Sequence, residues 1–135
     1  MHVSLAHPPG YELDEAVLCM AREVVKSRNA ELSTGLSLDE AVDGANIVYA
    51  RSWQSLEVYG NPTLAANRIA RSSGWTIDER VMARGSGAKF MHPMPVRRNL
   101  EATDEVLDGP RSLIGQQAEN RLHTQKGLLS LLLRS

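Results

Sequence analysis

Short apolar runs alternate with segments of mixed polarity along the whole chain. Residues 3–6, 47–50 and 88–91 are brief and almost wholly apolar, which is typical of parallel strands that are buried on both faces. The sequence His7-Pro8-Pro9-Gly10 ends the first of these runs with a turn signal. The pattern predicts five strands, at residues 3–6, 31–34, 47–50, 88–91 and 112–114.

Helical spacing separates the predicted strands. After residue 12 the apolar positions recur every three or four residues and predict an amphipathic helix to about Arg28, with one apolar face made of Leu13, Ala16, Val17, Met20 and Val24. Ser37 and Glu40 have the spacing of a capping box, and Asp78 can cap a helical turn over residues 79–83. Further helices are predicted over residues 64–71, from Thr103 to Gly109, and over residues 116–133.

Alternating strands and helices indicate one α/β domain. The expected architecture is a three-layer, doubly wound (Rossmann-like) parallel sheet of about five strands. In such folds ligands bind beyond the carboxyl ends of the strands. Three segments that follow predicted strands therefore become candidates for a site: residues 51–55, 92–99 and 116–121.

Composition and charge exclude several classes of protein. The chain has 135 residues, of which 42% are hydrophobic and 23% charged, as in ordinary globular domains. Fifteen Lys and Arg residues against sixteen Asp and Glu give a net charge of −1, so we expect no nucleic-acid partner. No apolar run approaches the roughly 20 residues of a membrane span, and no secretory signal is visible.

The single cysteine, Cys19, cannot form an internal disulfide or a cysteine metal cluster. This composition fits a reducing compartment, and we expect a cytoplasmic location. The sequence contains no His, Cys or carboxylate cluster with the spacing of metal ligands, so we expect no metal. It also contains no G-x-S-x-G motif, which leaves a serine hydrolase of that type without support.

The segment from His92 to Asn99 carries the clearest chemical signal. Two prolines flank Met94 and remove two amide donors, which leaves carbonyl acceptors beside an imidazole and two guanidiniums. Such a site suits a ligand that donates N–H groups on one side and carries an oxygen or negative charge on the other. The same residues are also compatible with a proline-rich turn bearing surface arginines.

Arg121 lies in the first turns of the last predicted helix, where anions are favoured. Arg51 follows the apolar run that ends at Ala50. A solvated helix face and a structural loop are the ordinary explanations for these two positions. If His92, Arg97 and Arg121 instead serve one site, their side chains should converge around one small anionic ligand at the end of the sheet.

Taken together, these segments resemble the carbamoyltransferase family, and within it the second, amino-acid-binding domain of N-acetylornithine and N-succinylornithine carbamoyltransferases. The resemblance covers nearly the whole chain and rests on the order and spacing of Leu5-Ala6-His7-Pro8-Pro9-Gly10-Tyr11, Val48-Tyr49-Ala50-Arg51-Ser52-Trp53, Ile77-Asp78-Glu79, His92-Pro93-Met94-Pro95-Val96-Arg97-Arg98-Asn99 and Gln117-Ala118-Glu119-Asn120-Arg121-Leu122-His123-Thr124-Gln125-Lys126. The family's carbamoyl-phosphate domain, with its Ser-Thr-Arg-Thr motif, has no counterpart here. The resemblance thus implies that residues 1–135 are a substrate domain truncated at its N-terminal side.

The resemblance also implies roles for individual residues. It implies transfer of a carbamoyl group from carbamoyl phosphate to the amine of an ornithine-like amino acid, without a cofactor. His92 and Arg121 would contact the carbamoyl phosphate as catalytic residues. The second substrate and the carbamoyl amide would be bound by Pro93, Met94, Arg97, Arg51 and Ser55. The intact family enzymes are homo-oligomers, typically trimers, whose sites borrow residues from a neighbouring subunit, so we expect the isolated chain to be inactive.

Two departures from the ornithine enzymes bear on the substrate. Pro93 replaces a cysteine and gives an aspartate-type His-Pro-x-Pro spelling. Arg51 stands where those enzymes carry an aspartate that holds the free α-amino group, and a cation there would repel an α-ammonium. An N-acylated or dicarboxylic substrate is therefore favoured, and an aspartate-type domain stays open.

Two other functional classes stay open as well. A non-catalytic amino-acid or anion-binding module could share the same fold. An unrelated Rossmann-type nucleotide domain ranks last, because no G-x-G-x-x-G motif follows a strand. Two structural expectations accompany the resemblance: a cis Met94–Pro95 bond, and an exposed apolar surface through which the chain self-associates.

Overall fold

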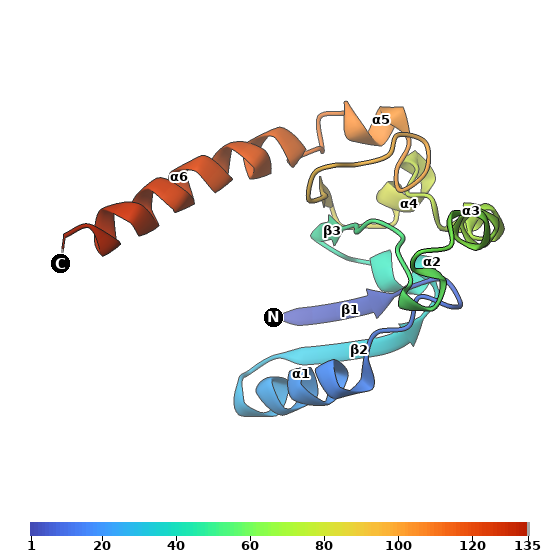
Figure 1. The fold of residues 1–135 in the computed structure, drawn as a ribbon, viewed down its shortest axis with the longest axis horizontal. Coiled ribbons are helices and arrows are strands. Elements are labelled where there is room, and N and C mark those ends of the chain that lie inside the picture. The colour runs from blue at the N-terminus through green and yellow to red at the C-terminus, as the bar shows by residue number, and fades with distance from the viewer. Residues whose placement is uncertain (135) are drawn as a thin grey trace.

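The computed structural model describes residues 1–134 and has strands and helices in alternation for most of its length (Figure 1). Its strands are β1 (His2–Ala6), β2 (Glu31–Leu36), β3 (Ile47–Tyr49) and β4 (Lys89–Met91). Its α-helices are α1 (Glu15–Ser27), α2 (Leu38–Val42), α3 (Pro62–Arg71), α4 (Glu79–Ala83), α5 (Asp104–Leu107) and α6 (Ile114–Leu132). Two short 3-10 helices, η1 (Leu56–Val58) and η2 (Ser73–Trp75), flank α3.

All strand pairing in the described residues is parallel, which confirms the α/β class. β1 pairs with β2, and β3 pairs with β4 so that Ile47 lies opposite Lys89 and Tyr49 opposite Met91. Within residues 1–134 the four strands make two separate parallel pairs, which is fewer than the roughly five strands expected. The segment predicted as a fifth strand contributes only a parallel bridge from Ser112 to Phe90, since α6 begins at Ile114.

Local capping signals set several helix boundaries. Ser37 and Glu40 form the expected capping box at α2, in which the Ser37 hydroxyl accepts from the Glu40 amide and the Glu40 carboxylate accepts from the Ser37 amide. Asp78 caps α4 by accepting from the Val81 amide at 2.8 Å. These helix starts follow from hydrogen bonds that the sequence encodes within three residues.

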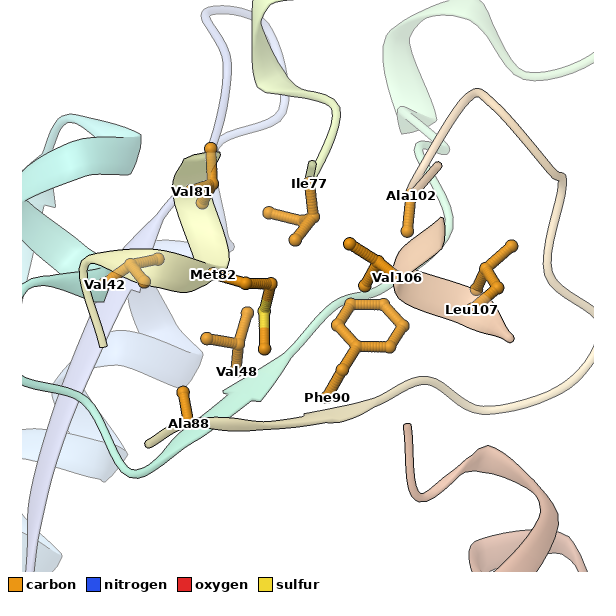
Figure 2. Packing of buried hydrophobic residues seen from close by; sticks show 10 residues of the cluster. All are labelled: Val42, Val48, Ile77, Val81, Met82, Ala88, Phe90, Ala102, Val106 and Leu107. Atoms are coloured by element: carbon orange, nitrogen blue, oxygen red, sulfur yellow. The ribbon is translucent and has the colours of Figure 1, made fainter. Parts of the chain in front are cut away.

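The core lies between the β3–β4 pair and helices α4 and α5 (Figure 2). Phe90 of β4 is fully buried and points into this cluster, as does Met82 of α4. The remaining buried apolar residues are Val42, Val48, Ile77, Val81, Ala88, Ala102, Val106 and Leu107. The core thus fixes the segments that follow β3 and β4, from which most of the candidate site residues come.

The apolar face expected of the first helix is not the one that packs on the sheet. Val17, Met20 and Val24 of α1 are 52–62% exposed, and Leu13 before the helix is 47% exposed. The half-buried apolar residues of α1, which lies against β2, are instead Leu18, Ala21 and Val25. Both sets have helical spacing, so periodicity alone did not distinguish the packed stripe from the exposed one.

Helix α6 extends away from the rest of the chain (Figure 1). It has no buried residue, and the leucines exposed along it are Leu122, Leu128, Leu129, Leu131 and Leu132. Near its start Gln117 donates a hydrogen bond to the Tyr49 hydroxyl at 3.1 Å. The expected exposed apolar surface is therefore present on both α1 and α6, and self-association through it stays a prediction.

Candidate functional site

A cavity among the described residues lies beyond the carboxyl ends of β1 and β3. Its volume is about 360 Å³. Aromatic and small side chains from the loop after β1, the loop after β3 and α3 form most of the wall, and Arg97 from the loop after β4 adds a cation. The lining residues are Tyr11, Trp53, Gln54, Ser55, Val58, Tyr59, Gly60, Asn61, Pro62, Ala65, Ile69 and Arg97. The position agrees with the general location of ligands in parallel α/β folds.

Arg97 is held at the cavity by a buried carboxylate. The Arg97 Nε donates to Glu101 Oε1 at 2.7 Å, and its Nη2 lies 2.5 Å from the same oxygen. The second oxygen, Oε2, accepts from the Arg97 backbone amide at 2.7 Å. The Glu101 side chain is fully buried, whereas that of Arg97 is 44% exposed. Glu101 therefore fixes the Nε and Nη2 side of the guanidinium and leaves Nη1, its outer part, free for an anionic ligand.

Arg97 also connects the loops after β4 and β3. Its Nη2 donates a long hydrogen bond of 3.5 Å to the backbone carbonyl of Trp53, one of the aromatic residues in the cavity wall. The cation and the aromatic wall are thus part of one local arrangement. The sequence separation of 44 residues between these two groups shows that the core brings them together.

His92 is completely buried at the start of the loop after β4. Its Nδ1 lies 2.5 Å from the carbonyl oxygen of Pro93, so this nitrogen carries the proton and donates to that carbonyl. The other ring nitrogen, Nε2, is buried without a hydrogen-bond partner in the described structure. Most buried polar atoms have partners, so a free Nε2 is the kind of atom that a ligand can satisfy.

The Met94–Pro95 bond is cis, as expected. Pro93 is half-buried, and the Met94 side chain is 52% exposed. Neither residue lines the cavity described above. That their carbonyl groups accept hydrogen bonds from the carbamoyl amide, as the resemblance implies, stays a prediction.

The expected convergence of His92, Arg97 and Arg121 is not found in one hollow. Of the three, Arg97 alone lines the cavity, whereas His92 is fully buried and Arg121 is exposed on α6. The physical reason is the direction of α6, which leaves the body of the chain after its first turns (Figure 1). Spacing along the sequence places Arg121 on that helix and carries no information on the helix direction.

Arg51 and Ser55 occupy different surroundings in the loop after β3. Arg51 is exposed and does not line the cavity. Ser55 does line it, but its hydroxyl oxygen accepts a hydrogen bond from Arg68 at 2.7 Å. Ser55 is therefore already bound to a protein group at the position where the resemblance implies a substrate contact.

The chain matches a family model along nearly its whole length. The model is described as the Asp/Orn binding domain of aspartate/ornithine carbamoyltransferase, and it matches residues 1–132. The chain belongs to the carbamoyltransferase family. This membership confirms the resemblance seen in the motifs.

Relatives and solved structures agree with the family. The chain is 38% identical over 133 residues to the N-acetylornithine carbamoyltransferase of Xanthomonas campestris pv. campestris, covering 98% of this chain and 39% of that protein. It is also 38% identical over 135 residues to the ornithine carbamoyltransferase of Clavibacter michiganensis subsp. michiganensis, covering 99% of this chain and 43% of that protein. The chain therefore spans about two fifths of the length of these carbamoyltransferases.

The fold is close to that of solved carbamoyltransferases. A crystal structure of acetylornithine transcarbamylase complexed with acetylcitrulline superimposes with a TM-score of 0.85, at 37% identity. The superposition covers 98% of this chain and 40% of the acetylornithine transcarbamylase chain. A mutant of N-acetyl-L-ornithine transcarbamylase complexed with carbamyl phosphate and N-succinyl-L-norvaline gives a TM-score of 0.86, again at 37% identity, with 98% of this chain and 40% of that one covered.

The two residues that follow Arg97 in the carbamoyltransferase motif have a structural role here. Arg98 binds both oxygens of Asp108, at 2.7 and 2.8 Å, and Asp104 at 2.6 Å. Asn99 has a positive φ of 58°, which asparagine tolerates well, and its side chain accepts from the Asp104 amide. Together these contacts hold the first turn of α5 beside the loop after β4.

Arg98 also sets how this part of the carbamoyltransferase domain responds to acid. Its hydrogen bonds are the largest cause of the lowered pKa of both Asp104 and Asp108. A carboxylate whose folded-state pKa lies below the ordinary 3.8 contributes stability above that pH and loses it as the pH falls through the folded-state value. The stabilising effect of Arg98 is therefore present at neutral pH.

We expect Arg98→Met to lower the free energy of unfolding at neutral pH, and we expect this deficit to shrink as the pH falls through the lowered pKa values of Asp104 and Asp108. Urea unfolding across this pH range measures the difference from the parent chain. The exposed Arg71→Met, on α3, is the control and should show no such pH-dependent difference. A deficit of Arg98→Met that is the same at both ends of the range would contradict the prediction.

Sequence reasoning missed Glu101 and Arg68, which bind the lining residues Arg97 and Ser55. A spacing of four residues between Arg97 and Glu101 was a visible signal, although it usually indicates an exposed ion pair. No local signal identified Arg68, because its partners are 11, 13 and 58 residues away. In residues 1–134 no group of His, Cys, Asp and Glu side chains is arranged to hold a metal ion. No described helix combines the length and apolar character of a membrane span.

Proposed function

We propose that the chain is the domain of a carbamoyltransferase that binds an N-acylated, ornithine-like amino acid. The observation that carries this proposal is the match of residues 1–132 to the Asp/Orn binding domain of the family. Transfer of the carbamoyl group would then require the carbamoyl-phosphate domain that such enzymes carry. We infer little or no turnover by these 135 residues alone.

The charges at the cavity favour an acylated α-amine. The lining residues given above include the cation of Arg97 and no carboxylate, so nothing in this lining offsets the charge of a free α-ammonium. An N-acyl amide is neutral, and its acyl group can pack against Tyr11 and Trp53. The α-carboxylate of the same substrate would pair with the outer part of Arg97 in a charge-assisted hydrogen bond.

In the proposed reaction the side-chain amine of the substrate attacks the carbonyl carbon of carbamoyl phosphate. A C–N bond forms and the C–O bond to phosphate breaks. The proton lost by the amine passes to the departing phosphate, which gives a ureido product and inorganic phosphate. Negative charge that develops on the carbonyl oxygen would be stabilised by His92 and Arg121. One oxyanion donor of this kind is typically worth about 10²–10³ in rate.

The protonation of His92 decides whether its Nε2 acts as a hydrogen-bond donor or as an acceptor. Because Nδ1 donates to the Pro93 carbonyl, a neutral ring presents Nε2 as an acceptor, and the ring must be protonated for Nε2 to donate to the oxyanion. A neutral His92 would instead accept an N–H of the carbamoyl amide or of the attacking amine. Both possibilities use the one ring nitrogen that is buried without a partner.

Titration of the 135-residue chain with amino acids tests the substrate class. We expect saturable binding of N-acetyl-L-ornithine or N-succinyl-L-ornithine by calorimetry, and binding of L-ornithine and L-aspartate that is at least about tenfold weaker, because an unpaired charge at a binding site costs more than 1.4 kcal/mol. Arg97→Met should abolish the binding, since it removes the cation expected to hold the carboxylate. Preferential binding of L-aspartate would favour the aspartate-type alternative, and equal binding of L-ornithine would overturn the acylated substrate.

Two further observations separate the enzyme from a binding module of the same fold. Incubation of the chain with carbamoyl phosphate and N-acetyl-L-ornithine should release no phosphate above the uncatalysed rate. The DNA upstream of the coding region should encode the Ser-Thr-Arg-Thr motif in frame. A genuine start at Met1 would favour the non-catalytic module, and turnover by the chain alone would contradict the inferred need for a second domain.

A further inference from the structure

One side chain that does not line the cavity connects three of the segments around it. Arg68 of α3 donates from Nη1 to the backbone carbonyl of Gly10 at 2.7 Å and to the hydroxyl of Ser55 at 2.7 Å. Its Nη2 donates to Glu57 Oε2 at 2.8 Å. The side chain is only 25% exposed. The guanidinium therefore joins α3 to the loop after β1 and to the loop after β3.

The loop after β1 is shaped to accept this guanidinium. Gly10 has a φ of +85°, and a Cβ at this position would lie 3.0 Å from Arg68 Nη1. A side chain at position 10 would thus be strained by the backbone and would press on the guanidinium. The Gly10 amide is also occupied, since it donates to Glu12 Oε1 at 2.9 Å. Both backbone groups of Gly10 are fixed, and its carbonyl is aimed at Arg68.

The segments that Arg68 joins are the ones that form the cavity wall. Tyr11 follows Gly10 directly, and Trp53 and Tyr59 flank the Ser55–Glu57 contacts along the loop after β3. Ala65 and Ile69, on the same helix as Arg68, also line the cavity. Arg68 itself stands behind this wall and contacts it through its hydroxyl, carboxylate and carbonyl partners. Loss of these bonds would free the loop without removing any group from the lining.

We propose that Arg68 is a positioning residue that holds the loop of residues 53–61 in the shape of the binding cavity. Ser55 and Glu57 serve as its anchors on the loop, so that Ser55 acts through Arg68 and not through the substrate. The inference that this cavity receives an N-acylated amino acid rests on the proposed function. The holding of the loop by Arg68 does not depend on the identity of the ligand.

Hydrogen–deuterium exchange of the 135-residue chain tests the positioning role. In Arg68→Met the amides of residues 56–61 should exchange about tenfold faster, because hydrogen bonds made by a charged group are lost and the loop opens locally. Arg68→Lys, which keeps the charge and can reach fewer partners, should lie between Arg68→Met and the parent. Arg71→Met is the matched control on α3 and should leave the loop unchanged. Exchange at the parent rate in Arg68→Met would overturn the proposal.

A merely stabilising role would give a different result. In that case exchange would also rise at the amides of the core strand β4, for example Phe90, whereas the proposed role confines the change to the loop. The indole N–H resonance of Trp53 should shift in Arg68→Met while that of Trp75, outside the cavity wall, keeps its position. Equal acceleration in the loop and in β4 would refute the positioning role.

Two milder variants keep the test decisive if Arg68→Met does not fold. Ser55→Ala and Glu57→Gln each remove one anchor from the loop and leave Arg68 in place. Each should accelerate exchange of residues 56–61 by a smaller factor, and parent-like rates in both would overturn the proposal. In a binding arm, N-acetyl-L-ornithine should bind more weakly to Arg68→Met than to the parent. Absence of binding to the parent would count against the proposed function alone, because the exchange result is independent of the ligand.

Discussion

Replacing Arg97 by methionine should destabilise the folded chain by about 3 kcal/mol, because it leaves the buried carboxylate of Glu101 without its ionic partner. Glu101 is 1% exposed, and its two oxygens bind the Arg97 guanidinium and the Arg97 backbone amide. Methionine preserves much of the side-chain volume, so the loss is mainly electrostatic. The measurement is the free energy of unfolding from urea titration at neutral pH.

A double-mutant cycle separates this effect from a simple loss of packing. Glu101→Gln removes the buried charge while keeping an acceptor for the Arg97 amide. The double variant Arg97→Met/Glu101→Gln should therefore be more stable than Arg97→Met alone, and its loss should be smaller than the sum of the two single losses by a coupling energy of about 1 kcal/mol or more. Additive losses would show that the two side chains do not act as a pair. If Arg97→Met changed stability by less than about 0.5 kcal/mol, as ordinary surface substitutions do, the prediction would fail.

Replacement of Phe90 by alanine should cost about 3–5 kcal/mol, the range seen when a large buried aromatic side chain is truncated. Phe90 is fully buried at the centre of the core between β3–β4 and helices α4 and α5 (Figure 2). Total stabilities of small domains are about 5–15 kcal/mol, so this single change removes a large part of the total. Thermal and urea unfolding of the variant measure the loss.

Phe90→Leu is the matched control, since it keeps the residue apolar and leaves a smaller cavity. It should cost clearly less than Phe90→Ala. Met20→Ala on α1 is a second control, because its side chain is 62% exposed and its truncation leaves the core intact. A loss at Met20 as large as the loss at Phe90 would show that the exposed stripe of α1 is covered in solution.

The stripe of α1 illustrates what periodicity cannot decide. The sequence contains two sets of apolar positions on this helix, and a hydrophobic pattern gives the spacing of both without naming the sheet on which either packs. The packed set, Leu18, Ala21 and Val25, is selected by where β2 lies, which is a property of the whole fold. The exposed set then becomes a surface available for association.

The motif after β4 shows the same limit within the site. Its chemistry could be inferred from residue types: a rigid proline-rich segment, an imidazole and guanidiniums for an anionic ligand. The residue types did not, however, show that the neighbouring Arg97 and Arg98 bind different partners. Arg97 lines the cavity and binds the buried Glu101, whereas Arg98 binds Asp104 in α5 and Asp108 just after it.

The sequence by itself determined the capped starts of α2 and α4, the strands formed by short apolar runs and the loop with the cis proline. Its motifs also determined the family. Each of these follows from bonds or preferences within a few residues, or from motifs read in order along the chain. The tertiary structure alone decided which residues share the cavity. Arg97 lines it, Glu101 and Arg68 hold residues of its wall, and Arg121 does not line it, because long-range packing sets the directions of helices and loops that no local pattern encodes.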